Sequence, residues 1–210
     1  MIEQGSEEWK RLRLGKVTGS RIKEILAKTK TGAAASRANY KAELVCERRT
    51  KTPLDGFSNG PMEWGKEMEA EARRRYEAET GVLVQEVAFV DHPTISMSGA
   101  SPDGLVGNDG LVEIKCPNTK THIETLLANK APSQYIAQMQ FQMACTGRAW
   151  CDFVSFDPRM PEAEQYFCIR VFKDEKYILE MEKEVIKFLS EVDQSIQLLD
   201  ARLKNDLQKL

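Results

Sequence analysis

Two short segments near the middle of the chain bring carboxylate side chains close to a lysine. The first contains Asp103 in the sequence Ser-Pro-Asp-Gly, and the second contains Glu113 and Lys115 in the sequence Leu-Val-Glu-Ile-Lys-Cys. Alternate side chains of a strand share one face, so Glu113 and Lys115 are expected to project together. The Gly-Asn-Asp-Gly sequence at 107–110 is typical of a hairpin turn, which would place Asp103 beside Glu113. The spacing therefore predicts two carboxylates and one ammonium group at the edge of a sheet.

This Pro-Asp…Glu-x-Lys pattern is typical of metal-dependent phosphodiester hydrolysis. Mg²⁺ prefers oxygen ligands, stabilises the negative charge that develops on a phosphate, and lowers the pKa of a bound water. Lys115 could hydrogen-bond the attacking water, or deprotonate it if burial lowers the pKa of the lysine. The alternative is a surface hairpin with an ordinary Glu–Lys pair. Val112 and Ile114 favour the catalytic interpretation, because they predict that the opposite face of this strand packs inside.

Two further polar residues are candidates for the same site. Glu69 lies on a predicted helix over 63–80 and could face the sheet, although its spacing does not distinguish it from neighbouring glutamates on a solvated face. Gln138 lies one helical turn after Tyr135 and could hydrogen-bond the attacking water or the phosphate. The alternative for Gln138 is a core amide whose hydrogen bonds are satisfied within the fold.

The composition agrees with one soluble domain that handles charged ligands. The chain has 210 residues, of which 41% are hydrophobic, and its net charge is −2. Residues 1–52 hold 13 Lys and Arg against 6 Asp and Glu, a balance of +7, which leaves −9 for the remainder. A basic N-terminal part on an acidic body favours a phosphate-binding surface beside a cation-binding centre. The alternative is that the basic helices are only solvated faces.

The cysteine and histidine content argues against a zinc or iron–sulfur site. The five cysteines form no Cys-x-x-Cys pair, and the two histidines lie far apart in the sequence. Free thiols in a reducing cytoplasm are the simplest interpretation. No apolar run approaches the length of a membrane span, and the N-terminus shows no signal peptide. We therefore expect a cytoplasmic protein with no membrane contact.

Cap and turn residues divide the chain into the elements that must position these groups. Serine and threonine suit the starts of several helices, and Gly81 and Gly147 suit the positions where helices end. The predicted helix starts are Ser6, Thr18 or Ser20, Ser36, Pro61 and Ser133. The predicted strands cover residues 82–90, 95–99, 111–116, 150–156 and 165–172.

The order of these elements predicts an α/β (α+β) fold with a central mixed β-sheet flanked by helices. We expect a single domain over 1–210. It comprises a basic helical N-terminal part (1–52), a catalytic core (61–172) and a long C-terminal helix (174–207). The apolar stripe of the last helix is more typical of core or oligomer contacts than of catalysis.

Seven short segments, spread in order from about Gly5 to Tyr177, carry a family resemblance. They are Trp9–Ser20, Trp64–Glu69, Ser101–Gly104, Glu113–Pro117, Ala137–Gln140, Asp157–Met160 and Asp174–Tyr177. Together they resemble the phage lambda exonuclease family, the YqaJ-like viral recombinase branch of the restriction-endonuclease-like superfamily. An ordered series of matches over most of the chain is far more specific than any single motif. The resemblance implies a restriction-endonuclease-like core.

The resemblance also implies a Mg²⁺-dependent 5′→3′ exonuclease, encoded by a phage or prophage and active in the cytoplasm of a bacterial host. Members of this family degrade the 5′-ended strand of linear double-stranded DNA processively and leave a 3′ single strand. A single-strand annealing protein then uses that strand in recombination. The family forms a toroidal homotrimer through which the DNA passes. Double-stranded DNA, an annealing partner and a homotrimeric ring are therefore expected for this chain.

Matching positions imply a role for each candidate residue. Lys115 and Gln138 would act on the nucleophilic water. Arg13, Ser20 and Ser101 would hold the terminal 5′-phosphate, in agreement with the predicted helix N-terminus near Ser20, which can bind an anion. The implied ligands of two Mg²⁺ ions, for which Mn²⁺ could substitute, are the side chains of Glu69, Asp103 and Glu113 and the backbone carbonyl of Ile114.

Two other classes of function remain open from the sequence. One is a DNA-binding or annealing module without catalysis, which the combination of Lys115 with three aligned carboxylates argues against. The other is a nuclease with the same core and another specificity, such as a site-specific endonuclease or a junction resolvase. Arg13 and Ser20 favour recognition of a DNA end over that alternative.

Overall fold

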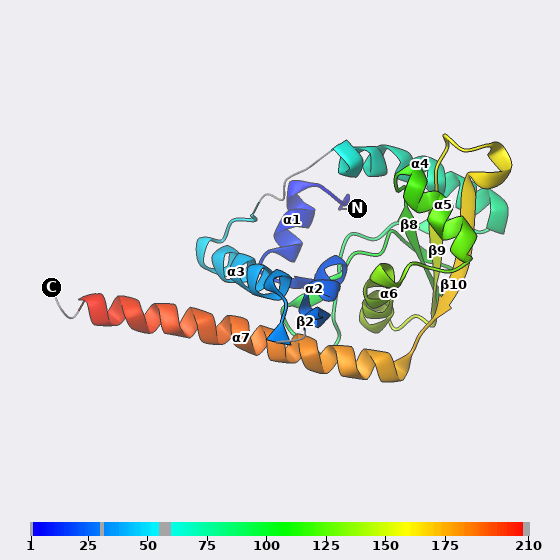
Figure 1. Cartoon of the computed structure of the whole chain (residues 1–210). Coiled ribbons are helices and arrows are strands. Elements are labelled where there is room, and N and C mark those ends of the chain that lie inside the picture. The colour runs from blue at the N-terminus through cyan, green and yellow to red at the C-terminus, as the bar shows by residue number, and fades with distance from the viewer. Residues whose placement is uncertain (1, 30–31, 55–59, 208–210) are drawn as a thin grey trace.

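A five-stranded sheet forms the centre of the computed structural model, which describes residues 2–29, 32–54 and 60–207. Its strands are β4 (Val84–Gln85), β7 (Gly104–Val106), β8 (Gly110–Lys115), β9 (Trp150–Phe156) and β10 (Tyr166–Phe172). The strand order is β10-β9-β8-β7-β4, and β8 pairs parallel with β9 and antiparallel with β7. The sheet is therefore mixed, and helices flank it (Figure 1), which confirms the predicted fold class.

A smaller sheet attaches the N-terminal segment to the core. Its strands are β1 (Val17–Thr18), β5 (Val90–Asp91) and β6 (Ser98–Ala100). β1 pairs parallel with β6, and β5 pairs antiparallel with β6. Because β6 ends directly before the Ser-Pro-Asp-Gly segment, this sheet holds the N-terminal residues close to Asp103. β2 (Lys28–Thr29) and β3 (Gly32–Ala33) form a separate antiparallel two-stranded sheet.

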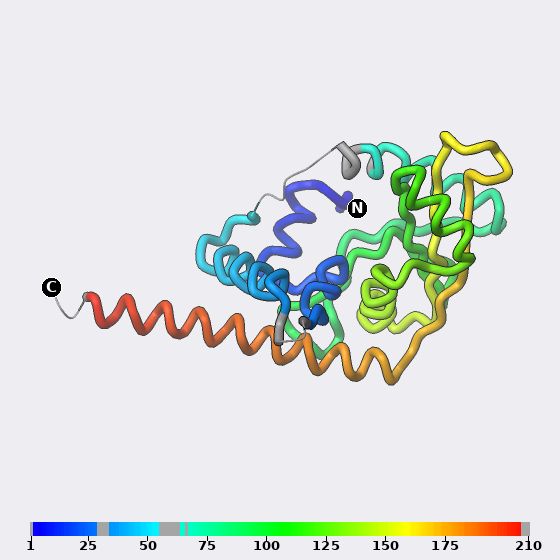
Figure 2. Tube along the Cα trace, viewed as in Figure 1, coloured from blue at the N-terminus to red at the C-terminus, as the bar shows by residue number. Residues whose placement is uncertain are grey.

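The helices occupy most of the remaining described chain. The α-helices are α1 (Glu7–Arg13), α2 (Ile22–Leu26), α3 (Ala35–Thr50), α4 (Gly60–Thr80), α5 (Thr119–Ala128), α6 (Ser133–Thr146) and α7 (Glu175–Leu207). The 3-10 helices are η1 (Gly19–Arg21) and η2 (Glu162–Glu164). α2 contacts α3, α6 and α7, so it attaches the N-terminal part of the chain to α6 and to the C-terminal helix (Figure 2).

Both faces of β8 are buried. Val112 and Ile114 pack with Tyr76 of α4 on one face, whereas Leu111 packs with Met143 of α6 on the other. The sequence predicted burial only on the face of Val112 and Ile114. The face that carries the predicted catalytic glutamate is therefore covered by a helix, and any charge on it needs partners within the fold.

The C-terminal helix α7 packs on the core from its start as far as Ile196. Val185, Phe188 and Val192 are buried, whereas Leu198 and Leu203 are 72% and 52% exposed. The distal part of α7 projects beyond the body of the protein (Figure 1). Among the described residues, none of the helices is long and apolar enough to cross a membrane.

The predicted helix ends are confirmed, whereas three predicted N-terminal caps are wrong. Gly81 and Gly147 both follow helices with φ of +71°, a conformation that glycine adopts without strain. Ser133 is the first residue of α6, and Pro132 occupies its N-cap position. Ser36 does not cap α3, because that helix begins one residue earlier and Ala34 occupies the N-cap position. The second predicted helix begins as the 3-10 turn η1, and its N-cap, Thr18, makes no side-chain capping bond.

The predicted strand over 82–90 is wrong, since this stretch contains only two short strands in different sheets. β4 pairs with β7 of the central sheet, whereas β5 pairs with β6 of the smaller one. Leu83, directly before β4, is 84% exposed, so its apolar side chain does not belong to a core strand. The helix α5 was not predicted, although Asn118 caps its start and Asn129 ends it in the left-handed conformation.

Candidate active site

The hairpin of β7 and β8 places Asp103 against the middle of β8. Gly104 pairs with Val112 across the hairpin, so Asp103 lies at its open end. One carboxylate oxygen of Asp103 (Oδ2) accepts a hydrogen bond of 2.7 Å from the backbone N–H of Ile114. The predicted approach of Asp103 to the strand that carries Glu113 is therefore confirmed.

Glu113 is fully buried beneath α6 and is surrounded by donors. Its exposed fraction is 0%, and its carboxylate forms an ion pair with Lys115. Gln138 donates from Nε2 to Oε1 of Glu113, and Gln142 donates from Nε2 to Oε2, each at 2.6 Å. The two glutamines lie one turn apart on the same face of α6. Together these donors hold the buried carboxylate in one orientation.

The site holds more negative charge than its lysine neutralises. Burial and the nearby carboxylates of Glu113 and Glu69 raise the pKa of Asp103 well above its usual value. Burial lowers the pKa of Lys115, but Glu113 and Asp103 outweigh burial, and the pKa of the lysine is raised overall. Beside these two carboxylates the ammonium form of Lys115 is favoured, and this form can donate the predicted hydrogen bond.

Glu69 lies on α4 at the margin of this centre. Its carboxylate is 35% exposed and forms an ion pair of 3.0 Å with Arg73. Within the described ranges, no three His, Cys, Asp or Glu side chains already stand together as a metal-binding group. The donor set itself fits Mg²⁺, because Glu69, Asp103 and Glu113 offer only oxygen atoms. Ile114 lies beside them on β8, and its carbonyl oxygen stays a predicted ligand.

A cleft of about 230 Å³ joins the carboxylate centre to the N-terminal segment. It brings the three predicted phosphate-binding residues together with three of the catalytic candidates. Glu69, Glu113 and Ile114 are not among the residues that line it. The described lining residues are Gln4, Trp9, Arg13, Gly19, Ser20, Ser101, Asp103, Lys115, Gln138 and Gln142.

Several cations of the basic N-terminal part form ion pairs within the chain. Arg21 pairs with Glu24 and Glu43. Three arginines of α3 pair with acidic residues of α7, at 2.6 to 2.8 Å. These three ion pairs are Arg37–Glu191, Arg48–Asp193 and Arg49–Asp200. The predicted basic surface is therefore partly used to attach α7.

Arg13 differs from those cations. In the described part of the chain, no hydrogen bond or ion pair joins its guanidinium to another side chain, and its Cζ lies 3.9 Å above the centre of the Trp9 ring. Burial lowers the pKa of Arg13 to about 10. A half-buried guanidinium that lines a cleft and lacks a carboxylate partner is suited to bind an anion with its planar donors.

Trp9 connects two of the predicted phosphate-binding residues. Its ring supports Arg13, and its Nε1 donates to Oγ of Ser101 at 3.0 Å and to the carbonyl of Ala88 at 2.9 Å. Gln4 donates to two backbone carbonyls of the same region. The sequence interpretation missed both residues, because these bonds join positions 79 to 98 residues apart, which no local pattern predicts.

Ser20 lies in the cleft, but not at the start of a long helix. It is an exposed residue of η1, which has three residues and leads into the five-residue α2. The predicted contribution of a helix N-terminus is therefore small. The predicted binding of an anion at this end of the cleft would therefore depend mainly on the hydroxyl of Ser20 and the guanidinium of Arg13.

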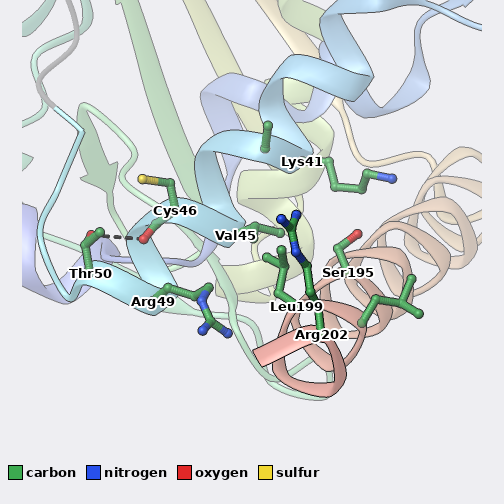
Figure 3. A pocket seen from close by; sticks show the side chains of 10 residues that line it. Lys41, Val45, Cys46, Arg49, Thr50, Ser195, Leu199 and Arg202 are labelled. Carbon is green, nitrogen blue, oxygen red and sulfur yellow. Dashed lines mark hydrogen bonds between the residues drawn. The ribbon is translucent and has the colours of Figure 1, made fainter. Parts of the chain in front are cut away.

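A larger groove of about 780 Å³ lies away from this cleft, between α3 and the distal part of α7 (Figure 3). Its lining is mainly apolar with a basic rim, and includes Val45, Leu199 and Arg202. None of the described residues that line it is acidic. It lacks the carboxylates that phosphodiester chemistry requires and is not a second candidate for catalysis.

Residues 8–149 match the family model of the YqaJ-like viral recombinase domain. The chain belongs to this family. The predicted resemblance is thereby confirmed on more than half of the sequence, in the part that contains every described lining residue of the cleft except Gln4. Among curated proteins, none matches the sequence significantly.

Solved structures agree with the family. An alkaline exonuclease from Laribacter hongkongensis, LHK-Exo, is 54% identical, with a TM-score of 0.89 over 95% of this chain and 99% of that chain. LHK-Exo in complex with dAMP covers the same shares at 54% identity, with a TM-score of 0.90. A phage-related exonuclease from Haemophilus somnus 129PT is 15% identical, with a TM-score of 0.66 over 88% of this chain and 96% of that one. That third likeness shows a shared fold.

Proposed function

We propose that this member of the family is a Mg²⁺-dependent exonuclease that degrades the 5′-ended strand of linear double-stranded DNA and leaves a 3′ single strand. The observation that carries the proposal is the single cleft that joins Asp103 and Lys115 to Arg13, Ser20 and Ser101. The 54% identity to an alkaline exonuclease supports it. LHK-Exo has been crystallised with dAMP, a nucleoside monophosphate of the kind that an exonuclease releases from DNA.

Glu69, Asp103 and Glu113, with the backbone carbonyl of Ile114, would hold two Mg²⁺ ions, and Mn²⁺ could take their place. Such ions, when bound, stabilise the charge that develops on the phosphate and lower the pKa of the attacking water. The chain supplies the three carboxylates from α4, from the segment before β7 and from β8. The repulsion of Asp103 by Glu113 and Glu69, which raises the pKa of Asp103, would favour a cation beside it.

Lys115 and Gln138 are the residues proposed to act on the attacking water. The ammonium group of Lys115 lines the cleft, where it can donate hydrogen bonds to the water and to the charge that develops on the phosphate. Gln138 also lines the cleft and donates to Glu113 at 2.6 Å. Its amide therefore connects the buried carboxylate to the space that the substrate would occupy.

Arg13, Ser20 and Ser101 are proposed to hold the terminal 5′-phosphate. The guanidinium of Arg13 is free of carboxylates in the described structure, and Trp9 fixes its position together with that of Ser101. A terminal phosphate bound there lies in the same cleft as Asp103 and Lys115. Its distance from these groups would select which bond is hydrolysed after each step.

The assembly and partners are proposals that rest on the family. We propose that the protein forms a homotrimeric ring around double-stranded DNA. Its partner would be a single-strand annealing protein that receives the 3′ strand. It would be encoded by a phage or prophage and would act in the cytoplasm of the bacterial host. A ring that encircles the DNA would serve processivity.

The phosphate role predicts a preference for phosphorylated ends. Duplex DNA with a 5′-phosphate should be digested about 10–100-fold faster than duplex with a 5′-hydroxyl, because a charged hydrogen bond contributes roughly 1.5–3 kcal/mol. Arg13→Ala should remove most of this preference. Initial rates on the two substrates measure it.

Arg11→Ala is the matched control, since Arg11 lies on the same helix, is exposed and does not line the cleft. It should leave the preference intact. Equal fractional losses on both substrates in Arg13→Ala would show that this arginine is only one of several backbone-contacting cations, and the phosphate role would then be wrong.

A further inference from the structure

The carboxylate of Glu113 is held by two amides, of which only one belongs to the roles proposed above. Gln138 donates to Oε1 and Gln142 donates to Oε2, both at 2.6 Å. Gln142 is 1% exposed, and it lines the cleft one helical turn beyond Gln138. Each oxygen of this buried carboxylate therefore has its own amide donor from α6.

Gln142 forms hydrogen bonds only through the donor end of its amide. Its carbonyl oxygen Oε1 is buried and has no partner among the described residues. Gln140, on the same helix and also buried, is satisfied at both ends, because it donates to the carbonyl of Phe172 at 2.8 Å and accepts from the N–H of Asp174 at 2.9 Å. A buried carbonyl oxygen without a partner costs folding free energy unless a ligand or a water molecule supplies the donor.

We propose that Gln142 is a positioning residue of the metal centre. Its amide N–H fixes the orientation of Glu113, and its free carbonyl oxygen accepts a hydrogen bond from a water molecule held in the cleft when the metal is bound. This inference rests on the proposed function, because it takes Glu113 as a metal ligand. Partners that orient a ligating carboxylate control metal affinity without touching the metal.

The alternative is that Gln142 only fills the core beneath β8. A residue with that role affects stability when it is replaced, but it does not affect metal affinity. The contrast with Gln140 separates the two interpretations, because both glutamines are buried on α6 and only Gln142 contacts Glu113.

The test is a calorimetric titration of the full-length protein with Mn²⁺ alone, without DNA. Two variants remove the contact in different ways: Gln142→Met keeps the length of the side chain without the amide, and Gln142→Asn keeps the amide but is too short to reach Oε2. Both should raise the dissociation constant for Mn²⁺ roughly 10–100-fold. Gln140→Met is the matched control, which should lower the melting temperature and leave that dissociation constant unchanged.

Wild-type Mn²⁺ affinity in either folded Gln142 variant would overturn the inference, and so would an equal loss of affinity in Gln140→Met. If Glu113→Gln weakens Mn²⁺ binding while the Gln142 variants bind normally, the inference fails and the proposed function stands. If the wild-type protein binds no Mn²⁺, both fail. The melting temperature of each variant verifies that it is folded at the temperature of the titration.

Discussion

Lys115→Ala is expected to reduce hydrolysis about 10²–10⁴-fold while DNA and metal binding persist, because general acid–base and hydrogen-bonding groups contribute on that scale. The amine of Lys115 is paired with the carboxylate of Glu113 and also lines the cleft. It is thus placed to act on the attacking water without being a metal ligand. Single-turnover rates at saturating Mg²⁺, together with DNA affinity measured in Ca²⁺, separate the chemical step from binding.

Lys120→Ala provides the control for this variant. Lys120 lies on α5, its side chain is 85% exposed, and its ion pair with Glu124 at 3.7 Å is of the surface kind that contributes little. It should keep the wild-type rate. A Lys115→Ala protein that retains more than about a tenth of the wild-type rate would contradict the role of the lysine.

Asp103→Asn and Glu113→Gln are expected to lose both metal affinity and Mg²⁺-dependent hydrolysis, by roughly 100-fold or more in rate. Each substitution removes an anionic oxygen ligand but keeps the size of the side chain. Ca²⁺ should support DNA binding without cleavage, because it accepts looser geometry and is a weaker catalyst in such sites. Calorimetry with Mn²⁺ and cleavage assays with Mg²⁺ measure the two effects separately.

Asp109→Asn is the matched control for Asp103→Asn. Asp109 lies in the turn of the same hairpin, is exposed, and does not line the cleft. This variant should bind metal and cleave DNA like the wild type. Unchanged metal affinity in both the Asp103 and Glu113 variants would show that these carboxylates are not ligands. Glu69→Ala should also weaken binding, because Glu69 lies close enough to Asp103 to raise its pKa.

The parts of the site that follow from local rules could be predicted from the sequence. Alternation along β8 placed Glu113 and Lys115 on one face, and the Gly-Asn-Asp-Gly turn returned the chain so that Asp103 meets the backbone of Ile114. The end of α6 at Gly147 was equally predictable, since the left-handed conformation there favours glycine. In each case the decisive interaction joins residues close in sequence.

The parts that depend on packing between distant segments could not be predicted. No pattern near Glu113 shows that α6 covers it, and the donors Gln138 and Gln142 come from 25 and 29 residues further along the chain. The i,i+4 spacing of these two glutamines was the one available signal for the second donor. The indole of Trp9, which joins Arg13 to Ser101, had no such signal.

The pairing of charges also depends on contacts between distant segments and could not be predicted from the sequence. The sequence predicted a basic surface over 1–52, but the acidic residues that neutralise part of it lie near the other end of the chain, on α7. Summed charge does not show which cations are paired. The structure shows that Arg13, which has no ion pair in the described part of the chain, lies in the cleft, whereas Arg48 and Arg49 serve to attach α7.

The most direct measurement of the central claim compares linear and covalently closed circular duplex DNA in Mg²⁺, with labels at the 5′ and 3′ ends of the linear form. The account predicts that the 5′-phosphorylated linear duplex loses its 5′ label first, releases mononucleotides and leaves an intact 3′-ended strand, while the closed circle survives. Cleavage of the circle at a comparable rate, or earlier loss of the 3′ label, would contradict an exonuclease that begins at the 5′ end.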